Sequence, residues 1–255
     1  MANKLSVVII TFNEEKNIAN CIEAALPVAD EIIIVDSFST DNTEQIASGY
    51  AKVKFIRHQW QGYSKTKNFA NEQASFPYIL SLDADEFISE ELQKSILHEK
   101  EKGLKGTYSF NRLTNYCGTF VKHCGWYPDE KIRIFPKGMA KWEGDFVHET
   151  LQITNPSLQN TRLKGDLLHY SYYSIDEHLQ RIEKYSALHA QKLKTEGKKP
   201  SLIKEYGSPV AKFIKTYFIQ LGFLDGKAGW DISRLSAKAV FLKYRKLRNL
   251  YRNDI

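Results

Sequence analysis

Four short apolar runs lie in the first third of the chain and alternate with segments of helical periodicity. The runs cover residues 5–10, 31–35, 53–56 and 78–82. They are rich in Val and Ile, which is typical of strands covered on both faces of a sheet. Helical patterns fill the intervals, up to Pro27 after the first run and over residues 62–74 before the fourth. The alternation predicts an α/β fold with a doubly wound, mostly parallel sheet.

Polar residues stand where two of these helices are expected to begin. Asn13 precedes Glu14 and Glu15, so it suits an N-cap followed by an acidic first turn. Asp41 and Glu44 have the spacing of a capping box. We therefore expect the side chains of Asn13 and Asp41 to bind backbone amides at helix starts.

Three carboxylates, Asp83, Asp85 and Glu86, follow the fourth apolar run directly. If the chain stays extended, Asp83 and Asp85 fall on one face and raise each other's pKa unless a positive charge lies between them. A divalent cation, Mg or Mn, is the simplest partner for such oxygen ligands. Glu86 belongs either to this group or to the start of the next helix, for which Ser89 is a suitable N-cap.

The other polar residues at strand ends are Asp36 and the stretch from Thr11 to Glu15. In parallel α/β sheets, ligands bind beyond the carboxyl ends of the strands. These positions and Asp83 therefore predict one binding site at a single edge of the sheet.

The pattern changes after Gly103. Residues 107–112, 131–135 and 166–170 are strand candidates, which would make the sheet mixed, and a helix is expected over 175–195. Two amphipathic helices follow in the tail. We expect a βαβ half at 1–102, a second half of the same domain at 103–174, and a helical extension at 175–255.

Charge is divided unevenly along the chain. Residues 178–255 hold 17 Lys and Arg against 6 Asp and Glu, a net +11, whereas residues 1–177 hold 19 against 24, a net −5. The basic amphipathic tail suits an anionic membrane surface or packing on the rest of the protein. The three cysteines are too few and too widely spaced for a disulfide framework or a zinc site. We expect no signal peptide and no membrane span, because no uncharged apolar run reaches the required length.

Three motifs resemble those of family 2 glycosyltransferases, inverting enzymes of the GT-A fold that use nucleotide sugars. They are Thr11-Phe-Asn-Glu-Glu15, Val35-Asp-Ser-Phe-Ser-Thr-Asp-Asn-Thr43 and Leu82-Asp-Ala-Asp85. Three later motifs resemble the subgroup that includes lipopolysaccharide core glucosyltransferases. They are Trp142-Glu-Gly-Asp145-Phe-Val-His148-Glu149, Leu168-His169-Tyr170 and Gly222-Phe-Leu-Asp-Gly226.

The resemblance implies a nucleotide-sugar-binding half at 1–102 and an acceptor-binding and catalytic half at 103–174. It assigns donor-binding roles to residues of the first half. Around the uridine, it implies Thr11, Phe12, Asn13, Glu15 and Asp36. Near the diphosphate, it implies Lys65, Lys67, Asp83, Ala84 and Asp85. Alternatively, Lys65 and Lys67 lie on the solvent-exposed face of a helix and contact no ligand. Arg133 would contact the donor phosphate or the acceptor, or pair with an acidic neighbour.

The resemblance also implies a metal and a base. Asp85 and Asp83 would hold Mg or Mn, with His169 or His148 as a further ligand. Glu149 is the expected base and Asp145 the second candidate. Trp142 suits either stacking on a sugar ring or filling the core.

The function implied is transfer of a sugar, first glucose, from UDP to a lipid-linked saccharide such as a lipopolysaccharide core. The location implied is the cytoplasmic face of the inner membrane, with the C-terminal helices on the lipid. Another cell-surface polysaccharide is the alternative acceptor. A nucleic-acid-binding protein is disfavoured because the positive charge is confined to the tail and no nucleic-acid-reading motif is present. Nucleotide transfer is disfavoured because no Gly-rich phosphate loop follows the first strand.

Overall fold

The computed structural model describes residues 4–144 and 149–252. Its strands are β1 (Leu5–Thr11), β2 (Glu31–Asp36), β3 (Val53–Arg57), β4 (Tyr78–Asp83), β5 (Glu86–Ile88), β6 (Thr107–Tyr116), β7 (Thr119–Phe120), β8 (Glu130–Pro136), β9 (Ala140–Glu143), β10 (Thr150–Ile153) and β11 (Asn160–Tyr172). Its α-helices are α1 (Ile18–Ala25), α2 (Thr43–Ala47), α3 (Tyr63–Glu72), α4 (Glu90–Lys102), α5 (Ile175–Thr195), α6 (Leu202–Ile214) and α7 (Gly226–Arg252). A π-helical turn η1 (Lys215–Ile219) and a 3-10 turn η2 (Gly222–Asp225) join the last two.

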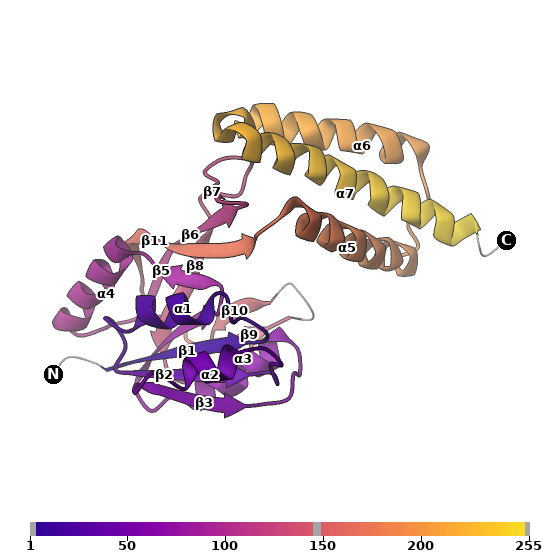
Figure 1. The fold of residues 1–255 in the computed structure, drawn as a ribbon. Coiled ribbons are helices and arrows are strands. Elements are labelled where there is room, and N and C mark those ends of the chain that lie inside the picture. The colour runs from indigo at the N-terminus through magenta and orange to yellow at the C-terminus, as the bar shows by residue number, and fades with distance from the viewer. Residues whose placement is uncertain (1–3, 145–148, 253–255) are drawn as a thin grey trace. The chain divides into compact units, whose positions relative to one another are not determined.

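The four predicted strands of the first third form the parallel part of the sheet, in the order β3, β2, β1, β4 (Figure 1). Successive side chains of β1 enter two different hydrophobic clusters. Val7 and Ile9 pack in the cluster that contains Ile18 and Ile22 of α1, whereas Val8 packs in the cluster that contains residues of α3. A strand with a helix on each face buries successive side chains, which is why these runs are mostly apolar and show little alternation.

Antiparallel strands extend this sheet beyond β4. The order continues β8, β6, β11, β5, and β7 pairs with β6, while β9 and β10 form a separate two-stranded sheet. The pairing of β11 with β5 sets His169 opposite Glu86, so a residue far along the chain reaches the carboxylates that follow β4. The predicted strands at 107–112, 131–135 and 166–170 are confirmed within β6, β8 and β11. The sequence analysis predicted no strands at β5, β7, β9 and β10, because these short segments lack a clear alternation of apolar and polar residues.

Of the three predicted helix starts, the first is wrong, the second is confirmed in part and the third is confirmed. Helix α1 begins at Ile18, and Asn13 lies before it with a positive φ of 55°, where its side chain binds a neighbouring loop. Helix α2 begins at Thr43, after Asn42, so the capping box of Asp41 with Glu44 does not form, but Asp41 still accepts a hydrogen bond from the backbone N–H of Thr43 at 3.0 Å. Ser89 caps α4 as predicted, since its side chain accepts a hydrogen bond from the backbone N–H of Leu92.

The chain divides into two compact units. Unit 1 comprises Met1–Arg112 and Asp129–His169, and unit 2 comprises Leu113–Pro128 and Tyr170–Ile255. The predicted division at 102 and 174 separates parts by their expected roles rather than by compactness, and it remains a prediction.

Unit 2 contains the three long C-terminal helices. Helix α5 begins and ends where the sequence pattern places it, and α7 packs against both α5 and α6 (Figure 1). Among the residues that the structure describes, none of the helices combines the length and apolar character needed to cross a membrane.

Candidate active site

The loops that follow β1 and β2 are joined by hydrogen bonds. The Asn13 side-chain oxygen accepts from the backbone N–H of Thr40 at 2.8 Å, and the backbone N–H of Glu15 donates to Asp41 at 3.1 Å. The carboxylate of Glu15 also accepts from the side chain of Asn42 at 3.0 Å. Asn13 and Glu15 therefore lie at one edge of the sheet, as predicted, and they hold the two loops together.

Asp36 ends β2 and lies opposite Thr11 of β1. Its buried carboxylate accepts from the backbone N–H of Ser39 at 2.9 Å and from the hydroxyl of Ser39 at 2.5 Å. The carboxylate oxygens keep further lone pairs, so Asp36 can still accept from a ligand. Next to this pair, the side chain of Phe12 is more than half exposed and so available to a planar base.

The chain turns directly after β4, so Asp83 and Asp85 do not share one face. Strand β4 ends at Asp83, Ala84 and Asp85 form a turn, and β5 begins at Glu86. The prediction that the two aspartates project together from an extended segment is wrong. Short-range periodicity could not reveal the turn, because β5 leaves the direction of β4 to pair with β11, which lies about 80 residues later in the chain.

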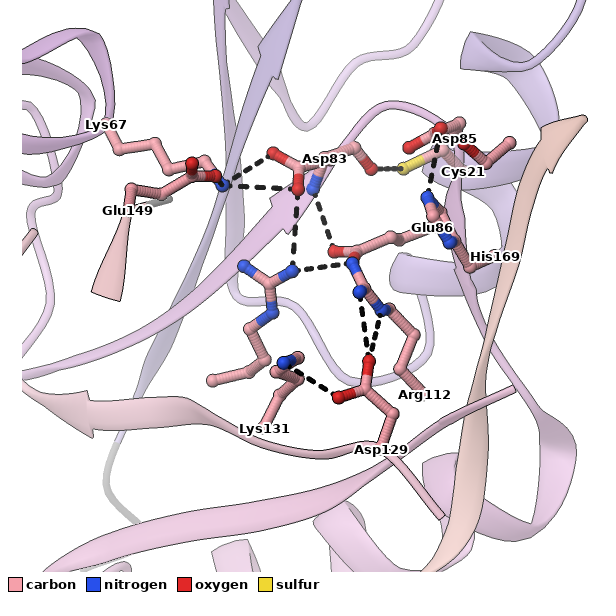
Figure 2. A network of polar contacts seen from close by, with 12 residues as sticks. Cys21, Lys67, Asp83, Asp85, Glu86, Arg112, Asp129, Lys131, Glu149 and His169 are labelled. Atoms are coloured by element: carbon pink, nitrogen blue, oxygen red, sulfur yellow. Dashed lines mark hydrogen bonds and ion pairs between the residues drawn. The ribbon is translucent and has the colours of Figure 1, made fainter. Parts of the chain in front are cut away.

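Asp83 lies between two cations of the chain itself (Figure 2). The ammonium of Lys67 is 2.9 Å from Oδ1, and Nη2 of Arg133 is 3.4 Å from Oδ2. Burial alone would raise the pKa of Asp83, but the charges of Lys67 and Arg133 outweigh it and hold the pKa well below its usual range. The positive charge expected beside Asp83 is thus supplied by the protein.

Glu86 is completely buried and belongs to this network rather than to a helix cap. Its Oε1 is 2.5 Å from Nη2 of Arg133 and 3.5 Å from Nη1 of Arg112, while its Oε2 accepts from the backbone N–H of Asp83 at 3.1 Å. Burial disfavours the charged form of Arg133, yet Glu86 and Asp83 raise its pKa. Of the alternatives for Arg133, pairing with acidic neighbours is the one observed.

Lys67 also reaches the candidate base. Its ammonium lies 3.2 Å from Oε1 of Glu149, and its side chain is only 1% exposed, so the solvated-face alternative is wrong for Lys67. Lys65, two positions earlier on α3, is exposed. Trp142 covers the cluster with its ring centre 4.5 Å from the Lys67 ammonium and 5.5 Å from the Arg133 guanidinium. The indole is buried, so it acts as cover for these cations.

Asp85 points to a different partner from Asp83. Its Oδ2 lies 3.3 Å from Nε2 of His169 (Figure 2). His169 lies on β11 and is the last residue of unit 1 in sequence. This pair combines the two predicted metal-binding types, carboxylate and imidazole. Within the part of the chain that the structure describes, no three Asp, Glu, His or Cys side chains gather as a metal-binding group. Asp145 and His148 lie outside the described residues.

Sequence reasoning missed Arg112 as a member of the network, and it left Glu86 open between the carboxylate group and a helix start. The alternation in Lys131-Ile-Arg133-Ile-Phe135 offered one signal, since Arg133 must then face the same side as Lys131, but it could not show that this side is buried against Glu86.

Comparison with known proteins identifies the family. Residues 6–151 match the sequence profile described as Glycosyl transferase family 2. The chain belongs to this family. Its mixed sheet, with a parallel half and C-terminal helices, confirms the predicted GT-A-like fold of this family 2 chain.

Two similar proteins align with nearly the whole chain. An uncharacterised glycosyltransferase of Rickettsia typhi is 32% identical and covers 97% of this chain and 87% of its own. The lipopolysaccharide core biosynthesis glycosyltransferase LpsC of Rhizobium meliloti is 29% identical and covers 94% and 93%. Among solved structures, TarS 1–349 of S. aureus in complex with UDP-GlcNAc aligns with a TM-score of 0.45 at 16% identity, over 98% of this chain and 92% of TarS.

Proposed function

We propose that this family 2 glycosyltransferase moves a sugar from a UDP-sugar to a saccharide acceptor, with inversion at the anomeric carbon. One observation carries the proposal. Asp36 and Asp83 pair with adjacent residues, Thr11 and Ile10, on opposite sides of β1. Two strand spacings separate them by about 10 Å. That span suits a nucleoside diphosphate whose base lies near Asp36 and whose phosphates lie near the carboxylates after β4.

The nucleoside would lie on the loops after β1 and β2. Phe12 offers an exposed ring, and Asp36 offers a carboxylate acceptor for N–H or hydroxyl groups of uridine. Asn13 and Glu15 would hold the shape of this pocket, because their side chains already join its two loops.

Asp85 and His169 would hold a Mg or Mn ion. They face one another at 3.3 Å, and a carboxylate with an imidazole fits Mn well. Such an ion neutralises charge on the leaving diphosphate. Asp83 is already paired with Lys67 and Arg133, so we assign it the role of positioning these cations, with Ala84 as the backbone link to Asp85.

Glu149 is the proposed base. Inverting transfer requires a group that takes the proton of the acceptor hydroxyl as that oxygen attacks the anomeric carbon. The carboxylate of Glu149 is partly exposed and is held at Oε1 by Lys67, which leaves Oε2 as the candidate atom for the proton. Asp145 remains the second candidate.

The acceptor proposed is a lipid-linked saccharide of the lipopolysaccharide core type, and glucose is the first donor sugar to test. Support comes from LpsC, which matches almost the whole chain. Another cell-surface polysaccharide remains the alternative acceptor. Family membership favours a transferase over a nucleic-acid-binding protein. A location on the cytoplasmic face of the inner membrane is part of the same proposal.

A panel of UDP- and GDP-sugars tests the donor, with Mn, Mg or EDTA present and release of the nucleoside diphosphate as the readout. We expect slow hydrolysis of one UDP-sugar, which requires the divalent ion and is lost in Asp85→Asn. Failure of UDP to bind in calorimetry with either ion, or undiminished turnover in EDTA, would overturn the proposal.

A further inference from the structure

Unit 2 exposes a set of large apolar side chains on elements that contact one another. They lie on α6, on the turns η1 and η2, and at the start of α7. The members are Leu202, Ile203, Tyr206, Val210, Ile214, Phe218, Ile219, Leu221, Phe223, Leu224 and Trp230. Ile203 and Ile219 are the most open, at 85% and 72% exposed. We call this set the apolar tip. Contiguous apolar surface of this kind marks an interaction site on a soluble protein.

The packing of α6 separates the apolar tip from the helix contacts inside unit 2. Glu205 is buried and pairs with Arg248 of α7 at 3.0 Å, so it marks the side of α6 that faces α7. At 3.6 residues per turn, the five exposed apolar residues of α6 fall within an arc of about 120°, centred about a third of a turn from Glu205. One face of α6 therefore packs against α7, and the other face exposes apolar side chains to solvent.

The charges around the apolar tip are mostly positive. Residues 198–238 contain eight basic residues and three acidic ones: Lys198, Lys199, Lys204, Lys212, Lys215, Lys227, Arg234 and Lys238, against Glu205, Asp225 and Asp231. All three carboxylates are paired inside unit 2. Glu205 binds Arg248, Asp225 binds His123 at 2.8 Å, and Asp231 binds Arg234 at 2.7 Å. Most of the positive charge is thus left without compensation from this segment.

We propose that the apolar tip docks on an anionic lipid bilayer, with α6 lying in the plane of the interface. Apolar side chains enter the boundary between headgroups and acyl chains, while the surrounding lysines meet anionic headgroups. Tyr206 and Trp230 have the amphipathic rings that suit this depth. A second copy of the chain fits less well, because a symmetric contact would bring two positive rims together. The inference concerns unit 2 alone and does not depend on the identity of the donor sugar.

Vesicle sedimentation with the full chain tests this surface. We expect binding to phosphatidylcholine vesicles that contain about 30 mol % phosphatidylglycerol, and weaker binding to phosphatidylcholine alone or at high salt. The double variant Ile203→Glu with Ile219→Glu should lower the vesicle-bound to free ratio at least about tenfold, because it places two charges in the apolar layer. Both positions are exposed, so little effect on folding is expected.

A matched control introduces the same two charges at exposed apolar positions outside the apolar tip, Met139→Glu with Leu188→Glu. This control should bind vesicles like the wild type, and both variants should retain the wild-type affinity for UDP. Equal vesicle binding by the two double variants overturns the proposal, as does a wild type that stays in solution with anionic vesicles. If the tip variant instead converts a dimer to a monomer in sedimentation velocity and leaves vesicle binding unchanged, the surface is an interface between copies and the lipid assignment is wrong.

Discussion

The ammonium of Lys67 lies 3.2 Å from the carboxylate of Glu149, a residue 82 positions away in the chain. The same ammonium is 2.9 Å from Asp83, so one buried cation serves the end of β4 and the candidate base together. This sharing couples the charge of Asp83 to the position of Glu149.

Replacement of Lys67 by Met should therefore destabilise unit 1. Removing one partner of a buried ion pair commonly costs 3–5 kcal/mol, and we expect about 3 kcal/mol because Arg133 still faces Asp83. Denaturant unfolding measures the loss. Lys65→Met is the matched control, since Lys65 is exposed on the same helix and its replacement should change stability by less than about 0.5 kcal/mol. Equal stability of the two variants would contradict the structural role of Lys67.

Replacement of Glu149 by Gln should separate chemistry from binding. The amide keeps the shape of the side chain but cannot take a proton from the acceptor, so turnover should fall by about 10² or more. The affinity for UDP, measured by calorimetry, should stay within a few-fold of the wild type. If Asp145→Asn shows this loss and Glu149→Gln does not, the role of base moves to Asp145.

The parallel half of the sheet was predictable because its strands are buried on both faces. Continuous runs such as residues 32–35 are apolar at every position because they lie between two helical layers, and that constraint is local in sequence. Helix α5 was equally predictable from its apolar periodicity, which breaks at Gly197, and the structure adds that the side chain of Ser174 caps it. The short strands β9 and β10 are paired only with one another, and their alternation is too brief to distinguish from loops.

The candidate site was predictable in residue types but not in their pairing. The sequence pointed to Asp83, Asp85, Lys67, Arg133, Glu149 and His169 as chemically relevant. It could not show that Asp83 faces Lys67 while Asp85 faces His169, because that division depends on a turn and on the register of β11 against β5. Long-range pairing is a property of the folded sheet and leaves no periodic signal.

The different surroundings of Asp83 and Asp85 predict different consequences of their removal. Asp85→Asn should abolish metal-dependent binding of UDP, and His169→Ala should weaken it, because both proposed protein ligands lie in this pair. Electron paramagnetic resonance of Mn in the presence of UDP reports binding without turnover. Asp83→Asn should retain the Mn signal but lower stability, since Lys67 and Arg133 lose a shared counter-charge. A Mn signal that survives in Asp85→Asn but disappears in Asp83→Asn would reverse the assignment.

His178 gives unit 2 a pH dependence of its own. The residue is buried on α5, where its Nδ1 lies 2.9 Å from the hydroxyl of Tyr116. Burial lowers the pKa of His178 to about 4, and the charges of Arg181 and Arg234 act in the same direction. In the unfolded chain, His takes up a proton near pH 6.5. Between about pH 6.5 and 4, the unfolded state therefore binds a proton that the folded state does not.

The stability contributed by neutral His178 is thus fully present above pH 6.5 and is lost as the pH falls toward 4. The difference amounts to at most about 3 kcal/mol. His178→Asn removes the titration while keeping a polar partner for Tyr116, so its unfolding free energy should vary less with pH than that of the wild type in this window. The exposed His98 on α4 provides the control, and His98→Asn should keep the wild-type slope. Denaturant unfolding at several pH values measures both slopes. A His178→Asn protein with the slope of the wild type would show that folding leaves the pKa of His178 unchanged, which contradicts this prediction.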